Sequence, residues 1–214
     1  MAAWARRISY RRMMNFVLFE TAIGCCGMVW SERGIAGVQL PERTEAATRK
    51  RLLRRFPVAH EAVPPAQVRR VIDDIVALLG GDRRDLNHVT IDIGAAPEFH
   101  RRVYEVARHI PAGATLSYGE VAERLGDRKL ARDVAEALSE NPCPIIVPCH
   151  RILAAGGKPG GFSAPGGVAT KLRLLTIEGA QPEGPMLFER LPLAAGGGHA
   201  VNGALSTTGL RNRK

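Results

Sequence analysis

Apolar residues follow a mixed strand and helix pattern as far as residue 94 and a mainly helical pattern beyond it, which predicts two structural parts. Residues 16–40 contain apolar and β-branched runs separated by glycine turns, which predicts strands. Helices are expected at residues 44–56 and 65–79, and in the second of them apolar side chains recur at helical spacing. A further strand at residues 89–93 completes a predicted α/β domain over residues 15–94.

The second part, residues 95–180, has the apolar spacing of helices. A helix is expected over residues 99–110, followed by a capping box in which Ser117 and Glu120 start the next helix. Gly126 ends that helix, and an apolar stripe marks another one. The stripe consists of Leu130, Val134, Ala137 and Leu138. Two short helices joined by a glycine turn are typical of a helix-turn-helix, whose second helix enters a groove of DNA.

The charge of the chain indicates a polyanionic partner. The sequence has 30 Lys and Arg against 21 Asp and Glu, a formal charge of +9, which favours nucleic acid over a membrane surface. The excess lies at the ends, since residues 1–56 hold 11 basic and 4 acidic residues, whereas residues 57–190 hold 16 and 17. We expect a basic disordered leader at residues 1–14 and a flexible tail at residues 181–214.

Cysteine usage argues against disulfide and metal frameworks. The 4 cysteines are too few and too unevenly spaced for a disulfide scaffold. The adjacent pair Cys25 and Cys26 has no further cysteine before Cys143 to complete a zinc site, so we expect no metal. No apolar stretch approaches the ~18 residues of a membrane span. These features predict a protein of the reducing cytoplasm that does not enter a membrane.

A strand-like apolar run leads to Cys149, which His150 and Arg151 follow directly. A thiol is a weak nucleophile until its proton is removed or cationic neighbours favour the thiolate. Neighbouring strand residues point to opposite faces, so His150 is expected to act through a water or after a turn. Glu178, at the end of a helix predicted over residues 167–177, is the candidate for orienting the imidazole. The alternative is a buried thiol beside a surface histidine.

Several further motifs accompany this cysteine in a fixed order over residues 97–180. They are Ile110-Pro111-x-Gly113, Ser117-Tyr118, Ala131-Arg132-x-Val134, Asn141 through Arg151, Gly160-Gly161-Phe162-Ser163 and Lys171 to Gly179. In this order they resemble the O6-alkylguanine-DNA alkyltransferase family, the methylated-DNA–protein-cysteine methyltransferases. The region before residue 97 matches more loosely.

The resemblance implies an α+β fold, with a small N-terminal α/β (ribonuclease-H-like) domain before a C-terminal winged-helix or helix-turn-helix domain. It also implies DNA repair by a single-turnover methyltransferase. Its partner would be double-stranded DNA containing O6-alkylguanine, with O4-alkylthymine as a second candidate substrate. The alkylated base is flipped out of the duplex and its alkyl group passes irreversibly to the cysteine. The resemblance implies a monomer with no cofactor.

By position in the motifs, the resemblance also implies a role for each catalytic residue. Cys149 would accept the alkyl group, and His150 would remove the thiol proton through a bound water. Glu178 would hold and polarise His150. Asn141 would brace the Cys149 loop through side-chain hydrogen bonds.

Substrate-binding roles follow from the same resemblance. Tyr118 would crowd the target phosphate and offer its hydroxyl to a ring nitrogen of the departing guanine. The carbonyls of Cys149 and Ile152 and the amide of Ser163 would read the guanine edge, and Phe162 would form an apolar wall. For Tyr118 the alternative is simple packing at a helix start.

Three other functions compete with alkyl transfer. A lesion-binding protein could flip alkylated bases without transfer, but relatives of that kind replace the acceptor cysteine. A winged-helix regulator could use Cys149 to sense alkylation or oxidation, although a sensor needs none of Asn141, Tyr118 and Glu178. A cysteine hydrolase lacks an evident oxyanion site.

The predicted recognition helix departs from the family pattern. Arg132 would fill the gap left by the flipped base, unless it is an ordinary solvated charge. The family continues with small neutral residues, whereas this chain has Asp133, Ala135 and Glu136. The two acids lie on or near the face that would approach phosphates, and the added methyl sits where the backbone approaches closely.

We therefore expect weaker, more salt-sensitive DNA binding than in a typical relative, because like charges repel. Replacing Asp133 by Ala together with Glu136 by Gly should tighten binding in a titration of duplex DNA at several salt concentrations. Unchanged affinity and unchanged transfer rate would show that these acids do not affect DNA binding.

Overall fold

The N-terminal sheet forms where glycine turns separate apolar runs. The computed structural model describes residues 13–180, and three antiparallel strands are its first elements: β1 (Met14–Phe19), β2 (Cys26–Ser31) and β3 (Gly34–Gln39). A short strand, β4 (Ala59–Glu61), pairs in parallel with β1 and gives the order β3-β2-β1-β4. The predicted strand region is confirmed.

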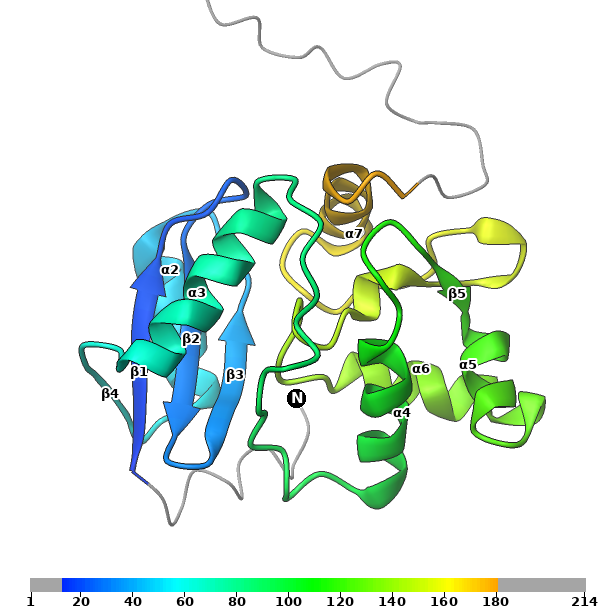
Figure 1. Cartoon of the computed structure of the whole chain (residues 1–214), viewed down its shortest axis with the longest axis horizontal. Helices are drawn as coiled ribbons and strands as arrows, with labels where there is room; N and C mark the ends of the chain where they lie inside the picture. The colour runs from blue at the N-terminus through cyan, green and yellow to red at the C-terminus, as the bar shows by residue number, and fades with distance from the viewer. Residues whose placement is uncertain (1–12, 181–214) are drawn as a thin grey trace, which may run out of the picture. The chain divides into compact units, whose positions relative to one another are not determined.

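Two helices cover this sheet from opposite faces (Figure 1). Helix α2 (Glu45–Arg55) starts at Thr44, whose side chain accepts a hydrogen bond from a first-turn amide, and α3 (Ala66–Leu79) follows β4. Both predicted helices are confirmed. Small residues on β2 and β3 let α2 approach closely, because a Cβ on Gly27 would meet Leu52.

The strand predicted at residues 89–93 is wrong. The backbone there pairs only around Ile35, which donates to the carbonyl of Thr90 at 2.9 Å and accepts from the amide of Asp92 at 2.7 Å. The chain then turns, since the amide of Ala96 bonds to the carbonyl of Ile93. Strand β4 was not predicted because it has three residues, two of them exposed and polar, and so carries no apolar alternation.

The C-terminal part consists mainly of helices. In chain order its elements are α4 (Glu98–Arg108), β5 (Leu116–Ser117), α5 (Tyr118–Arg124), α6 (Ala131–Ser139), β6 (Ile152–Leu153) and α7 (Gly167–Ile177), with 3₁₀ turns at Arg128–Leu130, Cys149–Arg151 and Ala155–Gly157. Strands β5 and β6 form a two-stranded parallel sheet. No helix within residues 13–180 is long and apolar enough to cross a membrane. The mixed fold of an N-terminal sheet and a C-terminal helical part is confirmed.

Helices α5 and α6 are adjacent, and α5 begins as the sequence predicts, whereas α6 begins at Ala131, after a 3₁₀ turn. The capping box at the start of α5 is complete, with the Ser117 amide donating to Glu120 at 2.6 Å and the Glu120 amide donating to Ser117 at 3.2 Å. Gly126 has a φ of 110° in the connection. Val134, Ala137 and Leu138 are buried on α6 as expected. Leu130 is only half-buried, because it belongs to the 3₁₀ turn before α6.

The carbonyl of Pro142 joins the sheet to the helical part. It accepts from the backbone amide of Val38 on β3 at 2.9 Å and from Nη2 of Arg55 on α2 at 3.0 Å. Cys143, the next residue, is fully buried. The segment that leads to Cys149 is therefore fixed directly to the sheet. The predicted leader and tail lie outside the described residues, apart from Met13 and Met14 of the leader, and Met14 begins β1.

The close contact between α2 and β3 should be sensitive to one methyl group. A Cβ on Gly37 would overlap the ring of Phe56, which is buried and has little room to move. Gly37→Ala should lower the free energy of unfolding by about 1–3 kcal/mol through overpacking, measured by urea denaturation. Gly161→Ala is the matched control, because a Cβ there meets no atom within 4 Å. Equal stability of the two variants would contradict this packing.

Candidate active site

The segment before Cys149 is a buried loop, and the strand expected there is wrong. Ile145 has a φ of 76°, and the amide of Val147 bonds to the carbonyl of Cys143 at 2.8 Å, so the chain folds back on itself. Cys149, His150 and Arg151 then form a 3₁₀ turn. The expected alternation of these side chains between two faces of a strand does not apply.

Asn141 connects the two ends of this loop. Its Oδ1 accepts from the amide of Cys143 at 2.9 Å, and its Nδ2 donates to the carbonyl of Val147 at 2.8 Å. The same Nδ2 lies 3.4 Å from Sγ of Cys149 as a donor. One amide side chain therefore holds the loop closed and contacts the thiol.

Glu178 brings the charged residues of the turn together. It follows α7, and its Oε1 lies 2.9 Å from Nε2 of His150. Arg151 donates to both of its oxygens, from Nε at 2.8 Å and from Nη2 at 2.7 Å. Burial raises the pKa of Glu178, but the hydrogen bonds from His150 and Arg151 outweigh it and lower the pKa to about 2. The carboxylate is therefore ionised.

The ionised carboxylate determines the proton position on His150. A carboxylate only accepts hydrogen bonds, so Nε2 of the imidazole carries the proton that lies between them. Burial lowers the pKa of His150, although Glu178 acts in the opposite direction. The imidazole is therefore neutral near neutral pH. Its Nδ1 is buried and has no hydrogen-bond partner among residues 13–180, which leaves one basic nitrogen available.

The Cys149 thiol is protonated in the resting protein. Burial raises its pKa, while the Asn141 amide and the charge of Lys171 act in the opposite direction. A thiolate is needed for nucleophilic attack. The thiol therefore depends on a neighbouring base.

Lys171 is a site residue to which the sequence interpretation gave no role. It lies fully buried on α7, donates from Nζ to the carbonyl of Ile152, and sits 5.8 Å from the centroid of the Tyr118 ring. Burial lowers its pKa to about 8, although Cys149 acts against this shift. The sequence does contain a signal for its burial. Lys171 precedes Leu174 by three residues and Leu175 by four, which places it on the apolar side of the predicted helix.

A cavity of about 530 Å³, called the tyrosine cavity below, opens beside the thiol. Its lining includes Tyr118, Cys149, Phe162 and Ser163, so three of the predicted substrate-binding residues meet the predicted nucleophile. Ile152 is fully buried in β6, and its carbonyl already accepts from Lys171.

The predicted DNA-binding residue lies outside this cavity. Arg132, Asp133 and Glu136 are all exposed on α6, whereas Ala135 lines the tyrosine cavity. The expected effect of these acids on DNA affinity stays a prediction. Over residues 13–180, no group of three His, Cys, Asp or Glu side chains is placed to hold a metal ion.

Comparisons with known proteins agree on one family. Residues 98–180 match the family described as "6-O-methylguanine DNA methyltransferase, DNA binding domain". A methylated-DNA–protein-cysteine methyltransferase of Methanothermobacter thermautotrophicus is 36% identical over 158 residues, which cover 74% of this chain and 81% of the relative. The enzyme of the same name from Mycobacterium tuberculosis is 30% identical over 166 residues, covering 78% and 93%.

Solved structures give the same result. The crystal structure of Mycobacterium tuberculosis O6-methylguanine methyltransferase has a TM-score of 0.62 at 29% identity, covering 78% of this chain and 93% of that chain. The same protein in complex with DNA has a TM-score of 0.62 at 28% identity, covering 77% and 92%. The chain belongs to the methylated-DNA–protein-cysteine methyltransferase family.

Proposed function

We propose that this protein repairs DNA by transferring the alkyl group of O6-alkylguanine to Cys149 in a single, irreversible turnover. The observation that carries the proposal is the unpartnered Nδ1 of a neutral His150 held by Glu178, beside a thiol that opens into a cavity. The family of the chain and the DNA complex of a structural neighbour support it.

The reaction needs one base and no net loss of protons. A water between Nδ1 of His150 and Sγ of Cys149 would pass the thiol proton to the imidazole. The sulfur then attacks the first carbon of the substituent, so that the S–C bond forms as the C–O6 bond breaks. The electron pair goes to the guanine, which takes up one proton. The thioether has no thiol proton and no easy leaving group, so Cys149 is not regenerated.

The tyrosine cavity is the proposed site for the flipped base. The base would lie between Tyr118 and Phe162, with the amide of Ser163 and the carbonyls of Cys149 and Ile152 at its edge. Hydrogen bonding from Lys171 leaves one lone pair on the Ile152 carbonyl for a base amine. Arg132, exposed on α6, would fill the gap that the flipped base leaves in the duplex.

We propose the same two domains that the family resemblance implies. Residues 15–94 would form a ribonuclease-H-like domain, and residues 95–180 a winged-helix domain with α5 and α6 as its helix-turn-helix. The short connection between these two helices supports this assignment. We also propose that the protein acts as a monomer in the cytoplasm, without a metal or cofactor.

A lesion-binding protein without transfer and a regulatory sensor are not favoured. Neither function requires a general base, whereas here Asn141 contacts Sγ of Cys149 and Glu178 holds the imidazole of His150, the next residue. A cysteine hydrolase would turn over repeatedly, and the mass measurement that follows separates it from single-turnover transfer.

The direct test is the mass of the intact protein after incubation with a duplex containing O6-methylguanine. We expect one added methyl group at one equivalent, mapping to Cys149 and absent in Cys149→Ser. Repeated turnover, or tight binding without an adduct, would contradict the proposal.

A second test removes the charge of Glu178. Glu178→Gln leaves Arg151 buried without a carboxylate, and it gives His150 an amide that can donate as well as accept, so Nε2 is no longer fixed as the protonated nitrogen. The free energy of unfolding should fall by about 3 kcal/mol. Near neutral pH, the transfer rate should fall about 100-fold. The rate deficit should shrink at alkaline pH, where the thiolate forms without a base.

Glu105→Gln is the matched control, because Glu105 is exposed on α4 and its carboxylate makes only long contacts, at 3.7 Å to Arg108 and 3.7 Å to His109. It should leave stability and rate nearly unchanged. A Glu178→Gln deficit that is the same at every pH would limit Glu178 to a structural role.

A further inference from the structure

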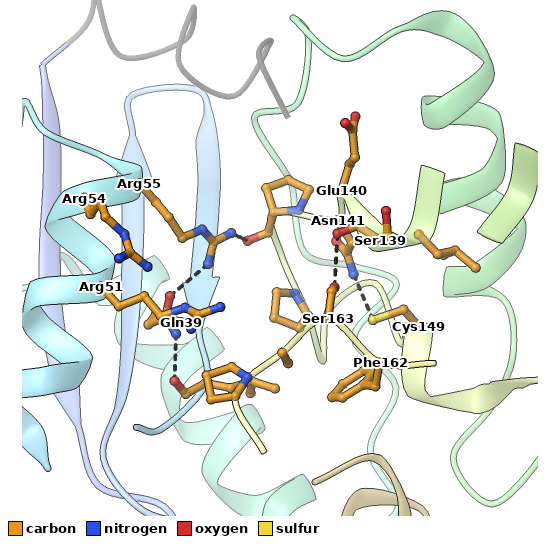
Figure 2. A pocket seen from close by; sticks show the side chains of 16 residues that line it. Gln39, Arg51, Arg54, Arg55, Ser139, Glu140, Asn141, Cys149, Phe162 and Ser163 are labelled. Atoms are coloured by element: carbon orange, nitrogen blue, oxygen red, sulfur yellow. Dashed lines mark hydrogen bonds between the residues drawn. The ribbon is translucent and has the colours of Figure 1, made fainter. Parts of the chain in front are cut away.

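A second cavity reaches Cys149 from the side of α2. It has a volume of about 390 Å³, and Figure 2 shows three arginines of α2 at one end and Cys149 at the other. We call it the arginine cavity, after Arg51, Arg54 and Arg55. Cys149 lines both cavities, together with Phe162. The two cavities therefore meet at the reactive thiol.

Arg55 carries a positive charge that no carboxylate neutralises among the described residues. Its guanidinium donates to three neutral oxygens: the carbonyl of Val38 at 3.0 Å, Oε1 of Gln39 at 3.1 Å and the carbonyl of Pro142 at 3.0 Å. Burial lowers its pKa to about 10, which still leaves it charged near neutral pH. A half-buried cation without a counter-ion favours an arriving anion.

The end of the arginine cavity that lies at α2 is positively charged overall. Arg51 donates to Glu42 at 2.8 Å and is thereby neutralised. Arg54 is exposed and has no polar partner within the part of the chain that the structure describes. Glu140 is the acidic residue of the lining, and it lies 3.5 Å from His100 on α4.

The reaction geometry places part of a long substituent in this cavity. The first carbon must lie between O6 of the guanine and Sγ of Cys149 for displacement. With the base in the tyrosine cavity, the remaining atoms of the substituent must extend from the first carbon to one side of the line that joins O6 and Sγ. The arginine cavity opens at the same sulfur, and its arginine end would then face the far end of the substituent.

We propose that the arginine cavity selects O6 substituents that end in a carboxylate, so that anionic alkyl groups are transferred faster than neutral ones of equal length. The inference rests on the proposed alkyl transfer and names its preferred substrate class. The bonds made and broken are those of methyl transfer, and the carboxylate itself does not react.

The test uses duplexes with O6-alkylguanines of graded chain length, each ending in a carboxylate, a neutral amide or an ammonium group. Single-turnover rates are read from the intact mass and divided by the O6-methylguanine rate of the same variant. For substituents long enough to reach α2, the carboxylate should exceed the amide by about tenfold, because charge-assisted hydrogen bonds to arginine are strong. The ammonium group should be slowest.

Arg54→Gln should reduce the carboxylate-to-amide ratio severalfold. Lys50→Gln is the matched control, because Lys50 is exposed on the same helix and lies outside the arginine cavity. It should leave the ratio and the methyl transfer unchanged.

Equal rates for carboxylate and amide at every length would overturn the inference, as would an unchanged ratio in Arg54→Gln. If Arg54→Gln instead weakens binding of unmodified duplex while the ratio stays the same, the arginines bind backbone phosphate and the inference is wrong. Failure of the proposed function itself looks different, since the wild-type protein would then form no methyl adduct.

Discussion

The buried carboxylate of Glu178 is the interaction on which the rest of the site depends. An ionised group in the interior is tolerated only when it is paired and hydrogen-bonded, and Glu178 has Arg151 and His150 as donors. These donors come from the turn that carries Cys149, while Glu178 comes from the end of α7. Arg151 also donates to the carbonyl of Ile110 after α4. One charge cluster therefore aligns three segments around the thiol.

This cluster also sets the chemical state of the site. The carboxylate holds the proton of His150 on Nε2, so Nδ1 is available as a base, and burial keeps the imidazole neutral. The thiol stays protonated until a base acts, because burial raises its pKa. A resting site of this kind protects an acceptor that can be used only once from reacting with other electrophiles. Lys171 adds a positive charge near the sulfur, which favours the thiolate as it forms.

Sequence reasoning located the reacting groups but not their local backbone. Helices α3, α4 and α6 were predictable because their apolar residues recur at helical spacing, and α5 because of its capping box. Cys149, His150 and Glu178 were predictable because their motifs occur in order. The loop before Cys149 was mistaken for a strand, because a buried loop and a buried strand have the same apolar composition. The roles of Lys171 and of the arginines of α2 depend on contacts between segments that are far apart in the sequence. The periodicity of apolar residues carries no information about such contacts.

The proton position on His150 tests the account most directly. Nitrogen-15 NMR of labelled protein distinguishes the two neutral tautomers from the imidazolium form. We expect a neutral ring near neutral pH with the proton on Nε2, and a change toward the other tautomer or a mixture of the two in Glu178→Gln. A proton on Nδ1, or a fully charged imidazolium in the unreacted wild-type protein, would contradict this expectation.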